Sequence, residues 1–190
     1  VLAFATAPDF DSPSDSDSNN IYTVTVTVND GTQAGSTITY TISVLNINDD
    51  VPQYASSDLT PSIVEGNTAV ETVTITDPDD DDVNQCSLTG ADASDFYCQI
   101  SATQFVLAFS SAPDYENPAD ANGDNQYVVS VTVSDGFNTG STLNYVVSVA
   151  DKNDNTPAYS SSDTTPSVNE GTSTVETVTI TDADTDAVDD

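Results

Sequence analysis

The chain has 190 residues, of which 32 are acidic, one is basic (Lys152) and none is His, so its formal net charge is −31. So few cations exclude nucleic acid and anionic lipid as partners, because both are bound through Lys and Arg. The same scarcity excludes the usual catalytic triads and phosphate clamps, and we expect no enzyme.

Strand patterns occur along the whole chain, with apolar residues alternating with Thr or Ser. The first lie at 22–28 and 38–44, and further strands are expected near 61–65, 70–76, 84–89, 96–101, 104–110, 127–133 and 143–149. Such alternation places one face of a sheet in a core and the other in water. About seven short strands separated by Gly, Pro, Asn and Asp turns predict an all-β, immunoglobulin-like antiparallel sandwich. No segment predicts a helix, and no apolar run is long enough to insert in a membrane.

The sequence repeats itself at an offset of 105 residues. Residues 1–85 align with 106–190 without a gap, and 46 of the 85 pairs are identical. A period this long indicates duplication of a whole domain. We expect the C-terminal half of one repeat in 1–50, a complete repeat in 51–155 and the N-terminal part of a third in 156–190. The chain opens within a strand-like segment, so we also expect it to be a piece of a longer protein.

The segment 151–157, Asp-Lys-Asn-Asp-Asn-Thr-Pro, resembles the Asp-x-Asn-Asp-Asn-x-Pro linker of the cadherin family, specifically its bacterial tandem cadherin-like repeats. Other family motifs have similar counterparts in the same order, namely Glu65, Asp77-Pro78-Asp79, Asp114-Tyr115-Glu116 and Asp135-Gly136. The resemblance implies calcium ions held between successive domains. Calcium takes six to eight oxygen ligands at about 2.3–2.6 Å. No single loop here offers that many, so two domains and their linker would share them.

The resemblance implies one ligand set for each of the two junctions. The later junction would use Glu65, Asp114, Glu116, Asp151, Asn153, Asp154, Asn155, Asp182 and Asp184. The earlier junction would use Asp9, Asp11, Asn46, Asn48, Asp49, Asp50, Asp77, Asp79 and Asp135. The earlier linker departs from the family pattern, with Asn46 for Asp, Asp50 for Asn and Asp11 for Glu. We expect these changes to weaken that junction or to alter the number of ions it holds.

Two alternative interpretations concern the acids. A coat of carboxylates also keeps proteins soluble in concentrated salt, but here the acids stand at turns and strand ends while exposed strand positions are mostly Thr and Ser. That placement favours sites over a coat. The loop 120–125 has the alternating oxygen donors of a calcium loop, and it equally fits an ordinary Asx-turn loop.

Cys86 and Cys98 flank a Gly-containing stretch between two expected strands. In a secreted domain such a pair favours a disulfide over a metal site. Two buried free thiols are the alternative.

Together these features predict an extracellular, calcium-stiffened structural or adhesive repeat of a long bacterial surface protein or filament. Its partners would be neighbouring repeats and, through lateral association, other copies of the same protein. The second hypothesis is a carbohydrate- or protein-binding sandwich that recognises surface glycans or proteins and owes its acidity to salt adaptation. Such a module needs an exposed aromatic platform, for which Phe10, Tyr115 and Phe137 are the candidates.

Overall fold

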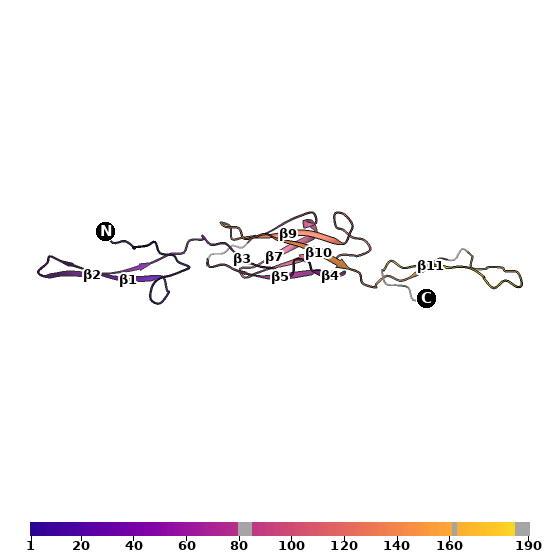
Figure 1. The fold of residues 1–190 in the computed structure, drawn as a ribbon, viewed down its shortest axis with the longest axis horizontal. Helices are drawn as coiled ribbons and strands as arrows, with labels where there is room; N and C mark the ends of the chain where they lie inside the picture. Colours follow the sequence, from indigo (N-terminus) through magenta and orange to yellow (C-terminus); the bar gives the residue numbers. More distant parts are fainter. Residues whose placement is uncertain (80–84, 161–162, 185–190) are drawn as a thin grey trace.

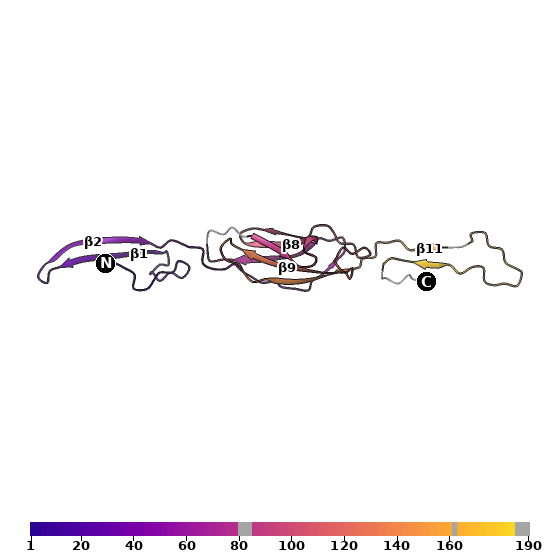
Figure 2. The ribbon, with the colours of Figure 1, turned by 90° about the horizontal axis from the view of Figure 1, so that it is seen from above.

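A computed structural model describes residues 1–79, 85–160 and 163–184. Figure 1 shows three parts along one long axis: a hairpin, a central sandwich and a second small hairpin. The first hairpin is β1 (Ile21–Asn29) with β2 (Ala34–Ser43), and the last is β11 (Ala158–Ser160) with β12 (Thr179–Thr181). The view turned by 90° shows the same line of three parts (Figure 2).

The central part is a sandwich of two four-stranded sheets. One sheet has the order β4-β10-β9-β6, formed by Ser62–Val64, Leu143–Ala150, Gln126–Ser134 and Gln85–Thr89. The other has the order β3-β5-β8-β7, formed by Gln53–Tyr54, Ala69–Thr76, Gln104–Phe109 and Phe96–Ile100. All pairings are antiparallel except that of β4 with β10. The all-β antiparallel sandwich expected from the strand pattern is confirmed, with eight strands in place of about seven.

The core follows from the alternation along the long strands. In β9 the side chains of Tyr127, Val129, Val131 and Val133 are all buried, while the residues between them are exposed or half-buried. The neighbouring strand β10 adds Tyr145 and Val147, and the facing sheet completes the core with Val73, Ile75, Phe105, Leu107 and Phe109. Between the sheets the ring of Phe109 stacks on Phe96 at 4.4 Å and meets Tyr127 edge-on at 5.0 Å.

A disulfide between Cys86 and Cys98 joins β6 to β7. These strands are the outermost members of the two sheets on the same side of the sandwich. The disulfide expected from the sequence is confirmed, and the free-thiol alternative is wrong.

The described residues contain a single short 3-10 helix, η1 (Ala93–Asp95), which joins β6 to β7. No helix among them is long and apolar enough to cross a membrane.

Candidate metal sites at the two junctions

The later junction is built where several strands of the central sandwich end together. Glu65 follows β4, and the linker 151–155 follows β10, which runs parallel to β4 and therefore ends at the same edge. Asp114 and Glu116 lie in the loop after β8. These acids line a cavity of about 290 Å³ together with Gly66, Pro113, Asn117, Asp154 and Asn155.

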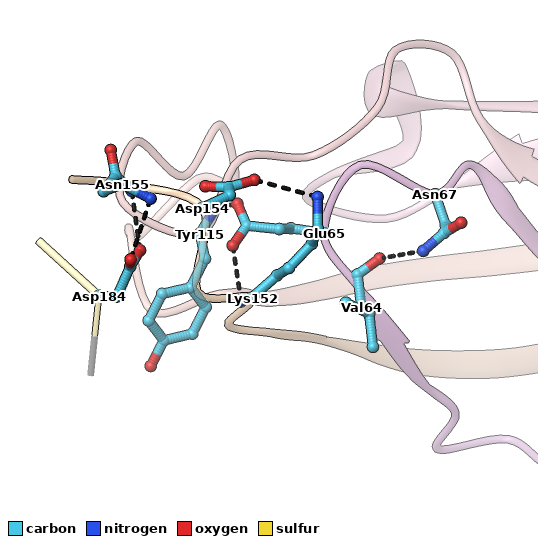
Figure 3. Close-up of polar contacts among 8 residues, drawn as sticks. All are labelled: Val64, Glu65, Asn67, Tyr115, Lys152, Asp154, Asn155 and Asp184. Atoms are coloured by element: carbon cyan, nitrogen blue, oxygen red, sulfur yellow. Dashed lines mark hydrogen bonds and ion pairs between the residues drawn. The ribbon is translucent and has the colours of Figure 1, made fainter. Parts of the chain in front are cut away.

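Glu65 holds this edge together. Its side chain is 5% exposed. One carboxylate oxygen accepts the amide of Tyr115 at 2.8 Å and the other accepts the amide of Lys152 at 2.9 Å. Figure 3 shows the carboxylate between these two segments. Glu65 thus ties the loop after β8 to the start of the linker.

Two groups of carboxylates meet at the later junction. In one, Glu65, Asp114 and Glu116 each place an oxygen within 4.8 Å of the others, and in the other Glu116, Asp151 and Asp184 do the same. Glu116 belongs to both groups, and its Oε1 is buried without a hydrogen-bond partner among the described residues. Desolvation, and then the charges of Glu65 and Asp151, raise the pKa of Glu116 above its ordinary value.

The third repeat reaches this junction through Asp184. Its carboxylate accepts both the backbone amide and the side-chain amide of Asn155 at 2.9 Å (Figure 3). Asp182 stands behind it and accepts the amide of Asp184 at 3.2 Å. Asp154 lies outside the two acidic groups and instead pairs with the Lys152 ammonium at 3.3 Å. Asn153 is exposed.

The earlier junction gathers four carboxylates, those of Asp11, Asp49, Asp50 and Asp79, within 4.8 Å of one another. Asp79 is 2% exposed. Its Oδ2 accepts the amide of Asp50 at 3.0 Å, and its Oδ1 has no partner among the described residues. Desolvation, and then the charges of Asp79 and Asp50, raise the pKa of Asp11.

Asp77 and Asp135 stand beside this cluster. Each has one buried carboxylate oxygen that lacks a hydrogen-bond partner among the described residues. Desolvation raises the pKa of Asp77, and the charges of Asp79 and Asp135 raise it further, although the amide of Asp79 donates to it. The other oxygen of Asp135 accepts the amides of Phe137 and Asn138 at 2.7 and 2.6 Å.

The rest of the expected earlier set is placed more loosely. Asp9 is exposed and accepts the amides of Asp11 and Ser12 at 3.0 and 3.1 Å. Asn48 accepts the side-chain amide of Asn138 at 3.0 Å. The sequence interpretation missed Asn138, whose only signal is its position three residues after Asp135. Both side-chain polar atoms of Asn46 are buried without a hydrogen-bond partner among the described residues.

The donor set at both junctions suits a hard cation. Carboxylate and amide oxygens are the ligands that calcium prefers. Buried carboxylates normally have hydrogen-bond or ion-pair partners, yet Asp77, Asp79 and Glu116 each have a buried oxygen with no hydrogen-bond partner in the described part of the chain. The one basic side chain of the protein, Lys152, pairs with Asp154 at the exposed edge of the later junction.

The loop 120–125 uses its acids differently. The Asp120 carboxylate accepts the amides of Asp124 and Asn125 at 2.9 and 3.2 Å. Asp92, beside it, accepts the amides of Ala121 and Val128 at 2.7 and 2.6 Å. Because both carboxylates are occupied by backbone donors, the geometry favours the Asx-turn interpretation of this loop over a calcium loop.

We compared the sequence with protein families and with known proteins. No family model matches the chain. The human cadherin EGF LAG seven-pass G-type receptor 2 is 31% identical over 158 residues, and its mouse counterpart is 30% identical over the same length. Each alignment covers 79% of this chain and 5% of the relative, so the chain spans a small part of these proteins.

Several solved cadherin and protocadherin structures resemble the fold of this chain. Mouse protocadherin-24 EC1-3 aligns with a TM-score of 0.61 at 19% identity, covering 91% of this chain and 59% of that one. The protocadherin gammaB7 EC3-6 cis-dimer structure aligns with a TM-score of 0.59 at 23% identity, covering 91% and 41%. The human desmocollin-1 ectodomain aligns with a TM-score of 0.57 at 17% identity, covering 76% and 30%. The chain therefore has a cadherin-like fold. The bacterial source expected from the linker stays a prediction.

Proposed function

We propose that this chain is a calcium-stiffened structural or adhesive segment of an extracellular, rod-shaped repeat protein. One observation carries the proposal: at each junction, carboxylates from successive parts of the chain converge around the linker, and some of their buried oxygens have no hydrogen-bond partner among the described residues. The sequence offers a single basic residue to compensate them. Calcium at both junctions would use the ligand sets expected from the sequence.

Electrostatics supplies the mechanism. Two unit charges about 4 Å apart repel by about 4 kcal/mol at the effective dielectric of a protein surface. A divalent cation converts that repulsion into attraction and holds three segments, one on each side and the linker between, in one geometry. Without the ion the junction is expected to loosen, and the line of domains becomes flexible.

The compartment fits this function. A disulfide between two edge strands indicates an oxidising environment such as the cell exterior. Extracellular calcium modules bind with dissociation constants of about 10⁻⁴–10⁻³ M, so they fill in a calcium-rich medium. The names of the relatives, among them cadherin and protocadherin ectodomains, support an adhesive role. The partners would be neighbouring repeats and laterally associated copies, and a bacterial surface protein or filament remains our expected source.

The alternative, a glycan- or protein-binding module, has little support from the described surface. Phe137 is 81% exposed but stands alone at a loop tip. Tyr115 is half-buried and packs against the core, and Phe10 is also half-buried. None of the three candidates forms the aromatic platform that such a module needs.

The test combines calcium calorimetry with small-angle scattering on the 190-residue chain, at concentrations where forward scattering reports a monomer. We expect saturable binding and an extended shape that a chelator makes more flexible. Asp184→Asn should remove binding at the later junction. Asp58→Asn should leave it unchanged, because it removes one charge from a residue whose carboxylate serves only the Thr60 amide and hydroxyl among the described contacts.

The opposite result is equally clear. If calcium produces no heat and the shape is indifferent to chelator, the acids form a solvating coat. Salt adaptation would then be the better account of the charge.

A further inference from the structure

The loop 120–125 lies between β8 and β9, and the proposed calcium sites do not use it. Its residues 121–124 are exposed. They include Asn122 followed directly by Gly123, and no other asparagine of the sequence precedes a glycine. Exposed loops of this kind are where chemical changes to a folded chain concentrate, because little packing restrains them.

Gly123 leaves its own backbone nitrogen open to the side chain that precedes it. Its φ is +71°, and a Cβ placed on it would meet no atom of the described residues within 4 Å. Its amide donates to the Asp120 carbonyl at 3.3 Å, beyond the usual range of about 2.7–3.2 Å for such a bond. Because glycine has no Cβ and this hydrogen bond is long, the nitrogen is poorly shielded from the Asn122 side chain.

The Asn122 side chain is the one amide among three polar side chains that alternate along this loop. Its Nδ2 donates to Asp124 Oδ2 at 2.8 Å. The other oxygen of Asp124 accepts the Gln126 amide at 2.9 Å, at the start of β9. The Asp120 carboxylate accepts the amides of Asp124 and Asn125. Asn122 therefore supplies a hydrogen bond to a carboxylate that helps to shape the entry into β9.

The counterpart loop 105 residues earlier also pairs one amide with one carboxylate. Asp17 stands there in the place of Asn122, and Asn19 stands in the place of Asp124. The Asn19 side-chain amide donates to Asp17 at 2.8 Å. The order of amide and carboxylate is reversed, but the contact is the same. Two carboxylates in these places would lack a donor between them and would repel each other.

We propose that Asn122 is a site of spontaneous deamidation, at which the chain converts its own asparagine into aspartate and isoaspartate. The Gly123 nitrogen forms a bond to the side-chain carbonyl carbon, Cγ, of Asn122, and the Cγ–Nδ2 bond breaks. Ammonia leaves, carrying Nδ2 and the proton released from the Gly123 amide, and a cyclic imide (succinimide) remains. Water then opens the imide at either of its two carbonyl carbons, which gives aspartate in one case and isoaspartate in the other.

The reaction removes the donor on which Asp124 depends. Both products place a second carboxylate beside that of Asp124. Isoaspartate also adds a carbon to the backbone, inside a turn that closes around the Asp120 carboxylate. We expect the loop to loosen, because the two carboxylates repel each other and a lengthened backbone no longer fits the turn.

The loop is also joined to the loop after β8 by side-chain hydrogen bonds. The Asn125 side-chain amide donates to the Tyr115 carbonyl at 2.8 Å, and the Tyr115 amide donates to Glu65 at 2.8 Å. The backbone carbonyl of Asn125 accepts the Val149 amide of β10 at 2.9 Å. Because these contacts tie the loop to the rest of the sandwich, its loosening should lower the stability of the whole central domain.

The test is to incubate the full chain in mildly alkaline buffer, which promotes loss of the amide proton, and to follow each asparagine by peptide mass spectrometry. Electron-transfer fragmentation distinguishes aspartate from isoaspartate. We expect Asn122 to convert to both products. Asn67, which is also exposed but precedes the β-branched Thr68, should keep its amide. Conversion at Asn122 no faster than at Asn67 would overturn the proposal.

Two variants assign the reaction to this pair of residues. Asn122→Gln keeps an amide but must close a larger ring, so conversion should be lost. Gly123→Ser reproduces the counterpart residue Ser18, which has a positive φ of 54°. Since a Cβ on Gly123 has open space among the described residues, this variant should fold and should keep its Asn122 amide after the wild type has reacted. Equal rates in Gly123→Ser and the wild type would show that the glycine does not control the reaction, and the assignment would be wrong.

Thermal unfolding of fresh and converted protein measures the structural consequence. Converted protein should melt at a lower temperature. Fresh Asn122→Asp should show part of that decrease, because it creates the second carboxylate without lengthening the backbone. If fresh and converted wild type melt at the same temperature, the Asn122 amide does not stabilise the loop, and that part of the proposal is rejected.

Discussion

The carboxylates of this protein fall into two kinds, which differ in whether hydrogen-bond donors occupy their oxygens. Glu71, Asp92 and Asp120 have their oxygens filled by serine, tyrosine or backbone donors. Asp79 and Glu116 each keep a buried oxygen without a partner among the described residues. The first kind stabilises loops and strands, whereas the second kind is costly unless a cation compensates it.

Glu71 provides a pH-dependent test of the first kind. Partial burial by itself would raise its pKa, but hydrogen bonds from Ser56, Tyr145 and Ser57 together lower the pKa below its ordinary value. A depressed pKa in the folded state means that the ionised carboxylate stabilises the fold. This stability is present above the unfolded pKa, near 4.3, and is lost as the pH falls through the lower folded value.

We therefore expect Glu71→Gln to lower the melting temperature by several degrees at pH 7. The difference from the wild type should shrink as the pH falls below about 4, the usual range for an unfolded glutamate. Thermal unfolding followed by circular dichroism between pH 2 and pH 8 checks this. A constant difference across that range would contradict the role of the ionised carboxylate.

Asp79 tests the second kind of carboxylate, the kind with an unpartnered buried oxygen. Its substitution should change the melting temperature in opposite directions in chelator and in calcium. In chelator, Asp79→Asn removes a buried charge from a group of four carboxylates and should raise the melting temperature. In calcium it should lower the melting temperature relative to the wild type, because binding contributes about 2.7 kcal/mol at a calcium concentration of 100 times the dissociation constant.

In the Asp79→Asn variant the Asp50 amide can still donate to the side-chain carbonyl oxygen of the new residue, so the local fold should survive. Differential scanning calorimetry with and without calcium measures both changes in melting temperature. If the variant is destabilised equally in both buffers, Asp79 is a structural residue and has no part in ion binding.

At the level of elements, the edge strands depend on support that the inner strands do not need. β9 and β10 pair on both sides, but β6 pairs only with β9, and β7 pairs only with β8. The disulfide between Cys86 and Cys98 joins these two edges to each other. It therefore closes the side of the sandwich that no other described strand covers.

Replacing both cysteines with alanine should lower the free energy of unfolding of the central sandwich by about 3 kcal/mol, as expected for a bridge that closes a short loop. Urea denaturation of the oxidised wild type, the reduced wild type and the double variant checks this. The reduced wild type and the double variant should agree. An unchanged midpoint after reduction would show that β6 and β7 are held by pairing alone.

At the level of the whole molecule, three parts lie along one axis and meet at two acidic junctions (Figure 1). With 32 acids and one lysine, the charges at the junctions repel one another, and compensating them would favour such a line. The proposed calcium function would supply that compensation at both junctions.

Much of the fold could be predicted because strand alternation is a local property. The pattern of Tyr and Val in 127–133 identified β9 and its buried face without any knowledge of its partners. The repeat at 105 residues and the linker motif likewise indicated where acids would gather. The sequence interpretation also chose the disulfide over free thiols on spacing and compartment alone.

Burial and convergence required the tertiary structure. Residues 22–28 carry the same alternation as 127–133, yet among the described residues Tyr22 and Val24 are half-buried, whereas Tyr127 and Val129 are buried because strands from 53–109 pack over them. For the same reason no pattern could say that Asp120 would be filled by its own loop while Asp79 would keep an unpartnered oxygen. The alternation of apolar and polar residues is a local property of the sequence. The burial of a side chain and the compensation of its charge depend on contacts with residues that are distant in the sequence.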